Sequence, residues 1–92
     1  MNKDACVELG YLSRAHGIRG EFKVRFDVHD INEYAKVKQL WLGRPDTPLQ
    51  VYEVRKFRIL AEDTAILAFT GVDDRNQADA MIGLTVYFPE AA

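Results

Sequence analysis

The sequence contains a single cysteine, Cys6, and only two histidines. One thiol cannot form an intramolecular disulfide, and no group of cysteines and histidines has the spacing of a metal site. We expect Cys6 to be a small buried side chain in the first strand. The 92-residue chain must therefore fold around one modest hydrophobic core, and we expect neither a metal nor a cofactor.

Long apolar runs are also missing. A membrane helix needs roughly 20 consecutive apolar residues, and no stretch of the sequence approaches that length. Residues 1–4 lack the basic and apolar regions of a signal peptide. These absences predict a cytoplasmic protein with no membrane partner.

Motifs for catalysis are absent as well. The sequence has no Gly-x-x-x-x-Gly-Lys phosphate loop and no evident partner that would make His16 or His29 catalytic. A barrel that binds a small molecule would need a larger interior than this chain can enclose. We therefore expect neither an enzyme nor a small-molecule substrate, and we favour a binding module.

The overall charge limits which partners such a module can bind. The formal net charge is −2, whereas non-specific nucleic-acid binding depends on many contacts between cations and phosphates. Any RNA contact must then be confined to a local basic face, and a basic protein partner would instead bind the acidic remainder.

The clearest local feature is a basic connector, RAHGIRGE, at residues 14–21. Its two glycines, Gly17 and Gly20, stand where the chain can take positive φ or let another backbone approach closely. Residues 7–12 before it are largely apolar, and residues 22–28 after it alternate between apolar and polar, as in a half-buried strand. The cations that this arrangement can place on one surface are Arg14, Arg19, Lys23 and Arg25. Two interpretations are open: a contact surface, or a hairpin whose arginines only remain solvated.

The rest of the chain predicts short strands and short helices. Strands are expected at residues 5–13, 21–27, 37–42, 49–60, 64–70 and 84–88. Asp30 is a candidate N-cap for a helical turn in residues 28–34, with Glu33 placed as in a capping box. Asp74 is a candidate N-cap for a second short helix that stops at Gly83. Six strands without βαβ alternation predict an all-β fold, a six-stranded antiparallel β-barrel with one or two short helices at the connections.

The fourth and fifth predicted strands have further distinguishing features. The apolar pattern of residues 49–60 slips near Arg55 and Lys56, which predicts a bulge or sharp bend. We interpret the basic cluster Arg55, Lys56 and Arg58 as solvent-facing residues that discourage unwanted pairing of an edge or bent strand. Both faces of residues 64–70 are largely apolar, so that strand is expected to be central or covered by the following helix.

Two stretches resemble a known family. Residues 9–24, LGYLSRAHGIRGEFKV, resemble the amino-terminal signature of the RimM family of ribosome maturation factors, and residues 71–87, GVDDRNQADAMIGLTVY, resemble the end of the same domain. The resemblance implies a translation-factor-like β-barrel, with residues 1–92 as a single RimM N-terminal-type domain. Family members carry a second, PRC-type barrel, so the resemblance implies that this domain is absent from the chain, which is either an excised domain or a natural short form.

The resemblance also implies a function. RimM-like proteins assist late assembly of the small ribosomal subunit head and 16S rRNA processing, so the implied partners are a head ribosomal protein and the immature small subunit, with local contact to rRNA. We place the contact surface at Arg14, His16, Gly17, Ile18, Arg19, Gly20, Lys23 and Arg25. The alternative is a generic translation-factor-like barrel that acts as a scaffold or protein-interaction module. Closure of the barrel alone could also demand such a connector.

Overall fold

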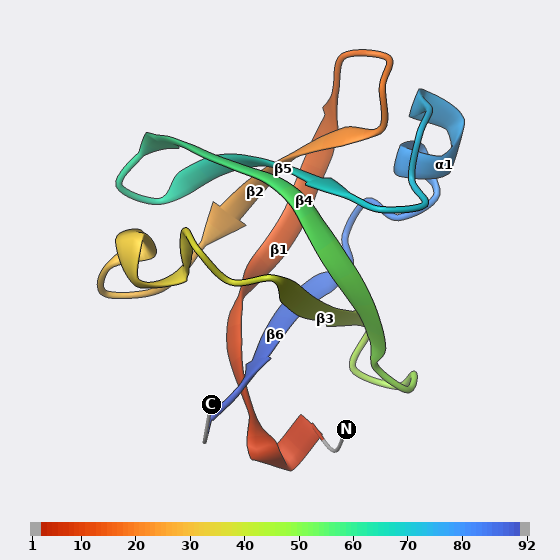
Figure 1. Cartoon of the computed structure of the whole chain (residues 1–92). Helices are drawn as coiled ribbons and strands as arrows, with labels where there is room; N and C mark the ends of the chain where they lie inside the picture. The colour runs from red at the N-terminus through yellow and green to blue at the C-terminus, as the bar shows by residue number, and fades with distance from the viewer. Residues whose placement is uncertain (1–2, 91–92) are drawn as a thin grey trace.

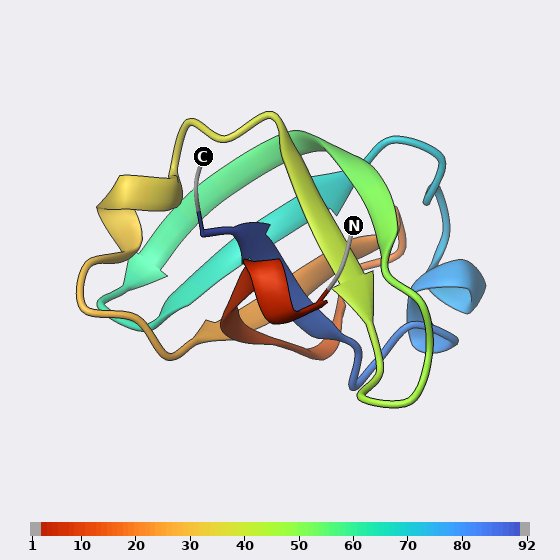
Figure 2. The same cartoon turned by 90° about the horizontal axis from the view of Figure 1, so that it is seen from below.

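Six strands form one sheet that closes on itself (Figures 1 and 2). Their apolar side chains fill the interior of this barrel. The computed structural model describes residues 3–90. Neighbouring strands are antiparallel and follow the closed order β1-β2-β5-β4-β3-β6. The strands are β1 (Cys6–His16), β2 (Glu21–Phe26), β3 (Gln39–Gly43), β4 (Gln50–Ala61), β5 (Thr64–Phe69) and β6 (Thr85–Pro89). The predicted six-stranded barrel is confirmed.

Three short helical segments lie at the ends of the strands. They are η1 (Lys3–Ala5), η2 (Ile31–Tyr34) and α1 (Arg75–Asp79). In the described part of the chain no helix is long and apolar enough to cross a membrane. The turn between β1 and β2 lies at the same end of the barrel as α1 (Figure 1). The two ends of the described chain lie side by side, where β6 ends next to η1 (Figure 2). There the Glu90 amide donates to the Ala5 carbonyl at 2.9 Å.

Both predicted N-caps form. The Asp74 carboxylate accepts from the Gln77 amide at 2.8 Å, and the Gln77 side chain accepts in turn from the Asp73 amide at 2.8 Å. Asp30 accepts from the side-chain and backbone N–H groups of Asn32, both at 3.0 Å. The bond from the Asn32 side chain, and to a lesser extent the bond from its backbone, holds the pKa of the Asp30 carboxyl below its ordinary value. The capping-box role predicted for Glu33 is wrong, because Asn32 supplies the partner.

The core fills the barrel with large apolar side chains. The largest fully buried ones are Phe22, Phe69, Leu9, Leu12, Leu40, Leu42, Ile66, Leu67, Val24 and Val86. The rings of Phe22 and Phe69 pack 5.8 Å apart between centroids, and Tyr52 packs 5.7 Å from Phe69. These rings join β2, β5 and β4 across the interior.

Register shifts in β1 and β4 decide which of their side chains face inward. The β4–β5 register shifts between Val54 and Lys56, so that Tyr52 and Val54 before the bulge, and Phe57 and Ile59 after it, all pack on the core. The predicted irregularity near Arg55 and Lys56 is confirmed. In β1 the register shifts between residues 12 and 14.

The predicted ends of α1 and β1 are wrong. α1 ends at Asp79 with its C-cap at Ala80, short of the predicted stop at Gly83. β1 ends at His16 rather than at residue 13, because residues 14–16 continue to pair with β2, so the connector shortens to residues 17–20. Cys6 is half-buried, because it lies where β1 begins at the end of the barrel. β4 is bent but is not an edge strand, because β5 and β3 pair with it from either side. β5 is central, as predicted, between β2 and β4.

The central position of Phe22 predicts a large loss of stability for Phe22→Ala. Truncation of a fully buried phenylalanine costs about 3–5 kcal/mol in the free energy of unfolding, and Phe22 is 0% exposed. Val51→Ala is the control, because Val51 is 51% exposed, and such a surface change costs about 0.5 kcal/mol or less. Urea unfolding of both variants measures the difference, and equal losses would contradict the assigned core.

Candidate functional site

The turn between β1 and β2 contains two glycines with different surroundings. Both have positive φ, 72° at Gly17 and 80° at Gly20. A Cβ atom on Gly20 would lie 2.5 Å from the Val72 carbonyl oxygen, whereas one on Gly17 would meet nothing within 4 Å. The Arg75 guanidinium donates to the Gly17 carbonyl at 3.4 Å. Gly20 therefore seats the turn against the barrel, and Gly17 leaves its backbone accessible.

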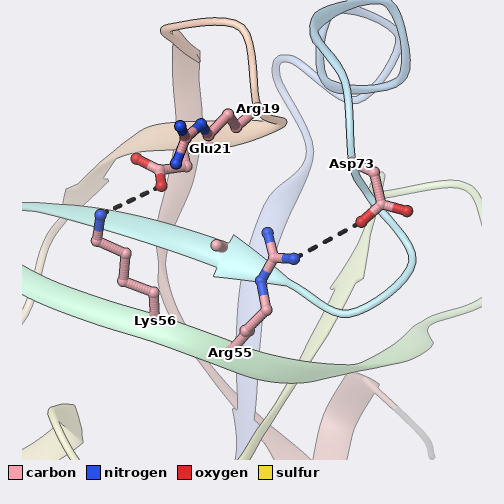
Figure 3. Close-up of a pocket in the computed structure, with 6 residues that line it drawn as sticks. Arg19, Glu21, Arg55, Lys56 and Asp73 are labelled. Carbon is pink, nitrogen blue, oxygen red and sulfur yellow. Dashed lines mark hydrogen bonds and ion pairs between the residues drawn. The ribbon is translucent and has the colours of Figure 1, made fainter.

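A hollow beside this turn gathers charges from four segments of the chain (Figure 3). The Lys56 ammonium lies 3.2 Å from the Glu21 carboxylate, and the Arg55 guanidinium lies 3.6 Å from the Asp73 carboxylate. Within residues 3–90, Arg19 at the rim of the hollow forms no ion pair or side-chain hydrogen bond. The charge of Arg19 is therefore available to a partner.

A row of cations crosses the outside of the barrel. In the strand registers Lys23 lies opposite Arg14 on one side and Ile66 on the other, and Ile66 lies opposite Arg58. Side chains alternate along a strand, so Ile66 faces outward beside the core residues Ala65 and Leu67. It is nonetheless 0% exposed, as expected if the aliphatic stems of Lys23 and Arg58 cover it. We call Arg14, Lys23 and Arg58 the cation row.

No acidic side chain neutralises the cation row in the part of the chain that the structure describes. The four ion pairs there involve other cations, Arg25, Arg55, Lys56 and Arg75. Arg25 is the nearest of these in register, opposite Tyr11 on β1, and its guanidinium lies 3.3 Å from the Asp63 carboxylate. The row therefore presents uncompensated positive charge on a protein whose net charge is −2.

The predicted site residues fall into two neighbouring groups and one supporting position. Arg14, Lys23 and Arg25 line one hollow, together with Tyr11, Ser13 and Thr64. His16, Gly17, Ile18 and Arg19 line another, together with Glu21 and Lys56. Gly20 is buried against the Val72 carbonyl, so the chain itself occupies the space that we expected a partner to approach.

Ile18 stands at the tip of the turn. Its side chain is 78% exposed, although burial would stabilise an isoleucine by roughly 1.5–3 kcal/mol. Single apolar residues on a surface are common, but this one adjoins an unpaired arginine and an open backbone. The tip can offer an apolar anchor to a partner.

Sequence reasoning missed two residues of the basic outer surface of the barrel, Arg58 in the cation row and Tyr11 in the hollow with Arg14. The sequence places Arg58 in a solvent-facing cluster on an edge or bent strand, and its distance of 35 residues from Lys23 hides the cross-strand relation. The signal was the alternation of charged and apolar residues in 22–26 and 56–59, which gives the outward positions once the order β2-β5-β4 is known. Among the described residues no group of side chains could hold a metal ion.

The sequence matches a known family over most of its length. Residues 7–92 match the family model of the RimM N-terminal domain. A ribosome maturation factor RimM of Bordetella avium is 36% identical over 95 residues, which cover 97% of this chain and 50% of the relative. A ribosome maturation factor RimM of Cupriavidus pinatubonensis is 31% identical over 99 residues, which cover 96% and 45%. The chain thus spans about half the length of these curated relatives.

Two solved structures share the fold. A crystal structure of a Pseudomonas aeruginosa protein described as a 16S ribosomal RNA processing protein RimM superposes with a TM-score of 0.81 at 24% identity, covering 94% of this chain and 51% of that chain. The solution structure of the N-terminal domain of RimM from Thermus thermophilus gives a TM-score of 0.70 at 20% identity, covering 94% and 91%. The barrel is therefore the fold of a RimM N-terminal domain.

The unequal surroundings of the two glycines predict unequal costs of substitution. Gly17→Ala places an alanine at positive φ in open space, which costs about 1–2 kcal/mol in the free energy of unfolding. Gly20→Ala adds a contact with the Val72 carbonyl and costs a further 1–3 kcal/mol or so. Thermal and urea unfolding of both variants measures the difference. A Gly20→Ala variant as stable as Gly17→Ala would contradict the close approach at Val72.

Proposed function

Because this chain belongs to the RimM family of ribosome maturation factors, we propose that it assists late assembly of the small ribosomal subunit head and 16S rRNA processing by binding, not by catalysis. The partners are a ribosomal protein of the head and the immature subunit, at a junction of protein and rRNA. The observation that carries this proposal is a turn whose exposed apolar tip, Ile18, adjoins the unpaired Arg19. The neighbouring cations Arg25, Arg55 and Lys56 are instead paired with carboxylates of the chain.

Each residue of the proposed contact surface has a physical role. Arg14 and Arg19 present guanidinium groups, which form forked hydrogen bonds to phosphates or carboxylates. Ile18 supplies an apolar anchor that gains free energy when a partner's pocket covers it. Gly17, with open space around its Cα atom, allows a partner to approach the backbone, and His16, Lys23 and Arg25 extend the surface along β1 and β2.

Gly20 has a different role within the same surface. It fixes the turn against Val72 before any partner arrives, and a preformed binding loop loses less conformational entropy on binding. The proposed mechanism is to hold an assembly-competent state of the junction and then to leave. Release requires only that the immature state be bound more tightly than the mature one.

The double variant Arg14→Ala and Arg19→Ala tests this surface. We expect it to weaken co-sedimentation with immature small ribosomal subunits by about tenfold, which corresponds to about 1.4 kcal/mol for the two lost charged contacts. Its melting temperature should match that of the unmodified protein, because neither side chain has a partner within residues 3–90.

A matched control removes the same charge elsewhere. Lys36 and Lys38 are exposed between η2 and β3, and neither ammonium group has an ion-pair partner among residues 3–90. Lys36→Ala with Lys38→Ala should leave co-sedimentation within about twofold of the unmodified protein. Equal weakening of co-sedimentation by the two double variants would mean that the loss reflects net charge alone, not contacts at the turn. No preference of the unmodified chain for immature over mature subunits would contradict the proposal and support the scaffold alternative.

A further inference from the structure

The exposed aromatic ring of Tyr11 lies beside Arg14 and Lys23 of the cation row. Tyr11 is 47% exposed, and its hydroxyl group has no hydrogen-bond partner among residues 3–90. It lines one hollow together with Arg14, Lys23 and Arg25. The ring is thus accessible and lies beside cations.

This combination is typical of surfaces that bind single-stranded nucleic acid. Bases of a single strand are unpaired and can stack on an aromatic side chain, while lysine and arginine contact the phosphates. Stacking tolerates any base because every base has a π-face. A duplex does not present its base faces in this way.

The cation row lies in a suitable direction for the same strand. It crosses β1, β2 and β4 with Ile66 of β5 between Lys23 and Arg58. Neighbouring strands are about 4.8 Å apart, so three strand spacings extend the row over about 14 Å. The three side chains come from separate strands of a closed barrel, so their backbone positions are fixed before binding.

Acidic side chains limit where a strand of RNA could run. Glu8 and Asp27 lie with Gly10 on the other side of Tyr11, where carboxylates would repel phosphates. Arg25 is already paired with Asp63 at 3.3 Å, so it contributes less free charge than the row. The favourable path therefore leads from Tyr11 toward Lys23 and Arg58.

We propose that this face binds a segment of single-stranded RNA, with one base stacked on Tyr11 and the phosphates held by Arg14, Lys23 and Arg58. The inference rests on the proposed function and assigns RNA, rather than an acidic protein segment, to this side of the barrel. Carboxylates of a protein would pair with the cation row equally well, but they would make no use of the exposed ring. Tyr11 and Arg58 both lie outside the predicted contact surface around the β1–β2 turn.

Fluorescence anisotropy with a labelled 12-nucleotide single-stranded RNA of mixed sequence tests the proposal on the full chain. We expect measurable binding whose affinity falls with salt with a logarithmic slope of about −2, from about 0.7 for each of three phosphates. The same sequence as a duplex, and a labelled glutamate peptide of equal charge, should bind at least about fivefold more weakly.

Three variants separate stacking from charge. Tyr11→Leu should lower RNA affinity roughly fivefold or more and leave the salt slope unchanged, because one stacked base contributes on the order of 1–3 kcal/mol. Tyr11→Phe should bind like the unmodified protein, because it keeps the ring. Arg58→Ala should reduce the magnitude of the salt slope by about 0.7. Lys36→Ala is the control for charge and should change neither quantity.

Other outcomes would overturn the inference. Binding of the glutamate peptide as tightly as the RNA would assign the surface to an acidic protein partner. A Tyr11→Leu variant with unchanged RNA affinity and unchanged melting temperature would contradict stacking on Tyr11 and overturn the inference. No RNA binding by a chain that still co-sediments with immature subunits would reject this inference and leave the proposed function standing. Loss of both would reject the two together.

Discussion

Closure of the barrel is the constraint on which the other features depend. A closed sheet has one interior, so every strand residue is assigned either to the core or to the outside, and a bulge is the means of changing that assignment within a strand. The bulge of β4 keeps Tyr52 and Phe57 in the core although they are five positions apart. The bulge of β1 places Leu12 in the core and Arg14 on the outside. The same constraint that buries the apolar residues therefore aligns the cation row.

Two contacts hold the β1–β2 turn and β4, which carries Arg58 of the cation row, against the same β5–α1 connection. Gly20 brings the β1–β2 turn against Val72, and the ion pair of Arg55 with Asp73 links β4 to the same connection. Such exposed ion pairs contribute little to stability, typically below about 1 kcal/mol. This pair nonetheless neutralises the charge of Arg55, which would otherwise add positive charge beside Arg19. On this side of the barrel, within residues 3–90, the cations left without an ion pair are Arg19 at the turn and the cation row on the barrel wall.

The sequence was sufficient for the architecture and for part of the site. Period-two alternation in residues 21–26, the cap at Asp74 and the apolar slip at Arg55 each have a local cause, so each could be predicted from neighbouring residues. The end of β1 could not, because residues 14–16 are strand only by virtue of pairing with β2. Arg58 joins Lys23 only through the order β2-β5-β4, and the burial of Gly20 depends on Val72, 52 positions away. These are tertiary relations that no local pattern contains.

Protection of individual lysines tests most directly whether the turn and the outer face of β1, β2, β5 and β4 meet the ribosomal partner. The chain, alone and bound to immature small ribosomal subunits, would be labelled briefly with an amine-reactive acetylating reagent and each lysine quantified by mass spectrometry. The account predicts that Lys23 on β2 loses reactivity on binding, whereas Lys36 and Lys38, outside the proposed surface, keep theirs. Protection of Lys36 and Lys38 with Lys23 still reactive would place the contact elsewhere on the barrel and contradict the account.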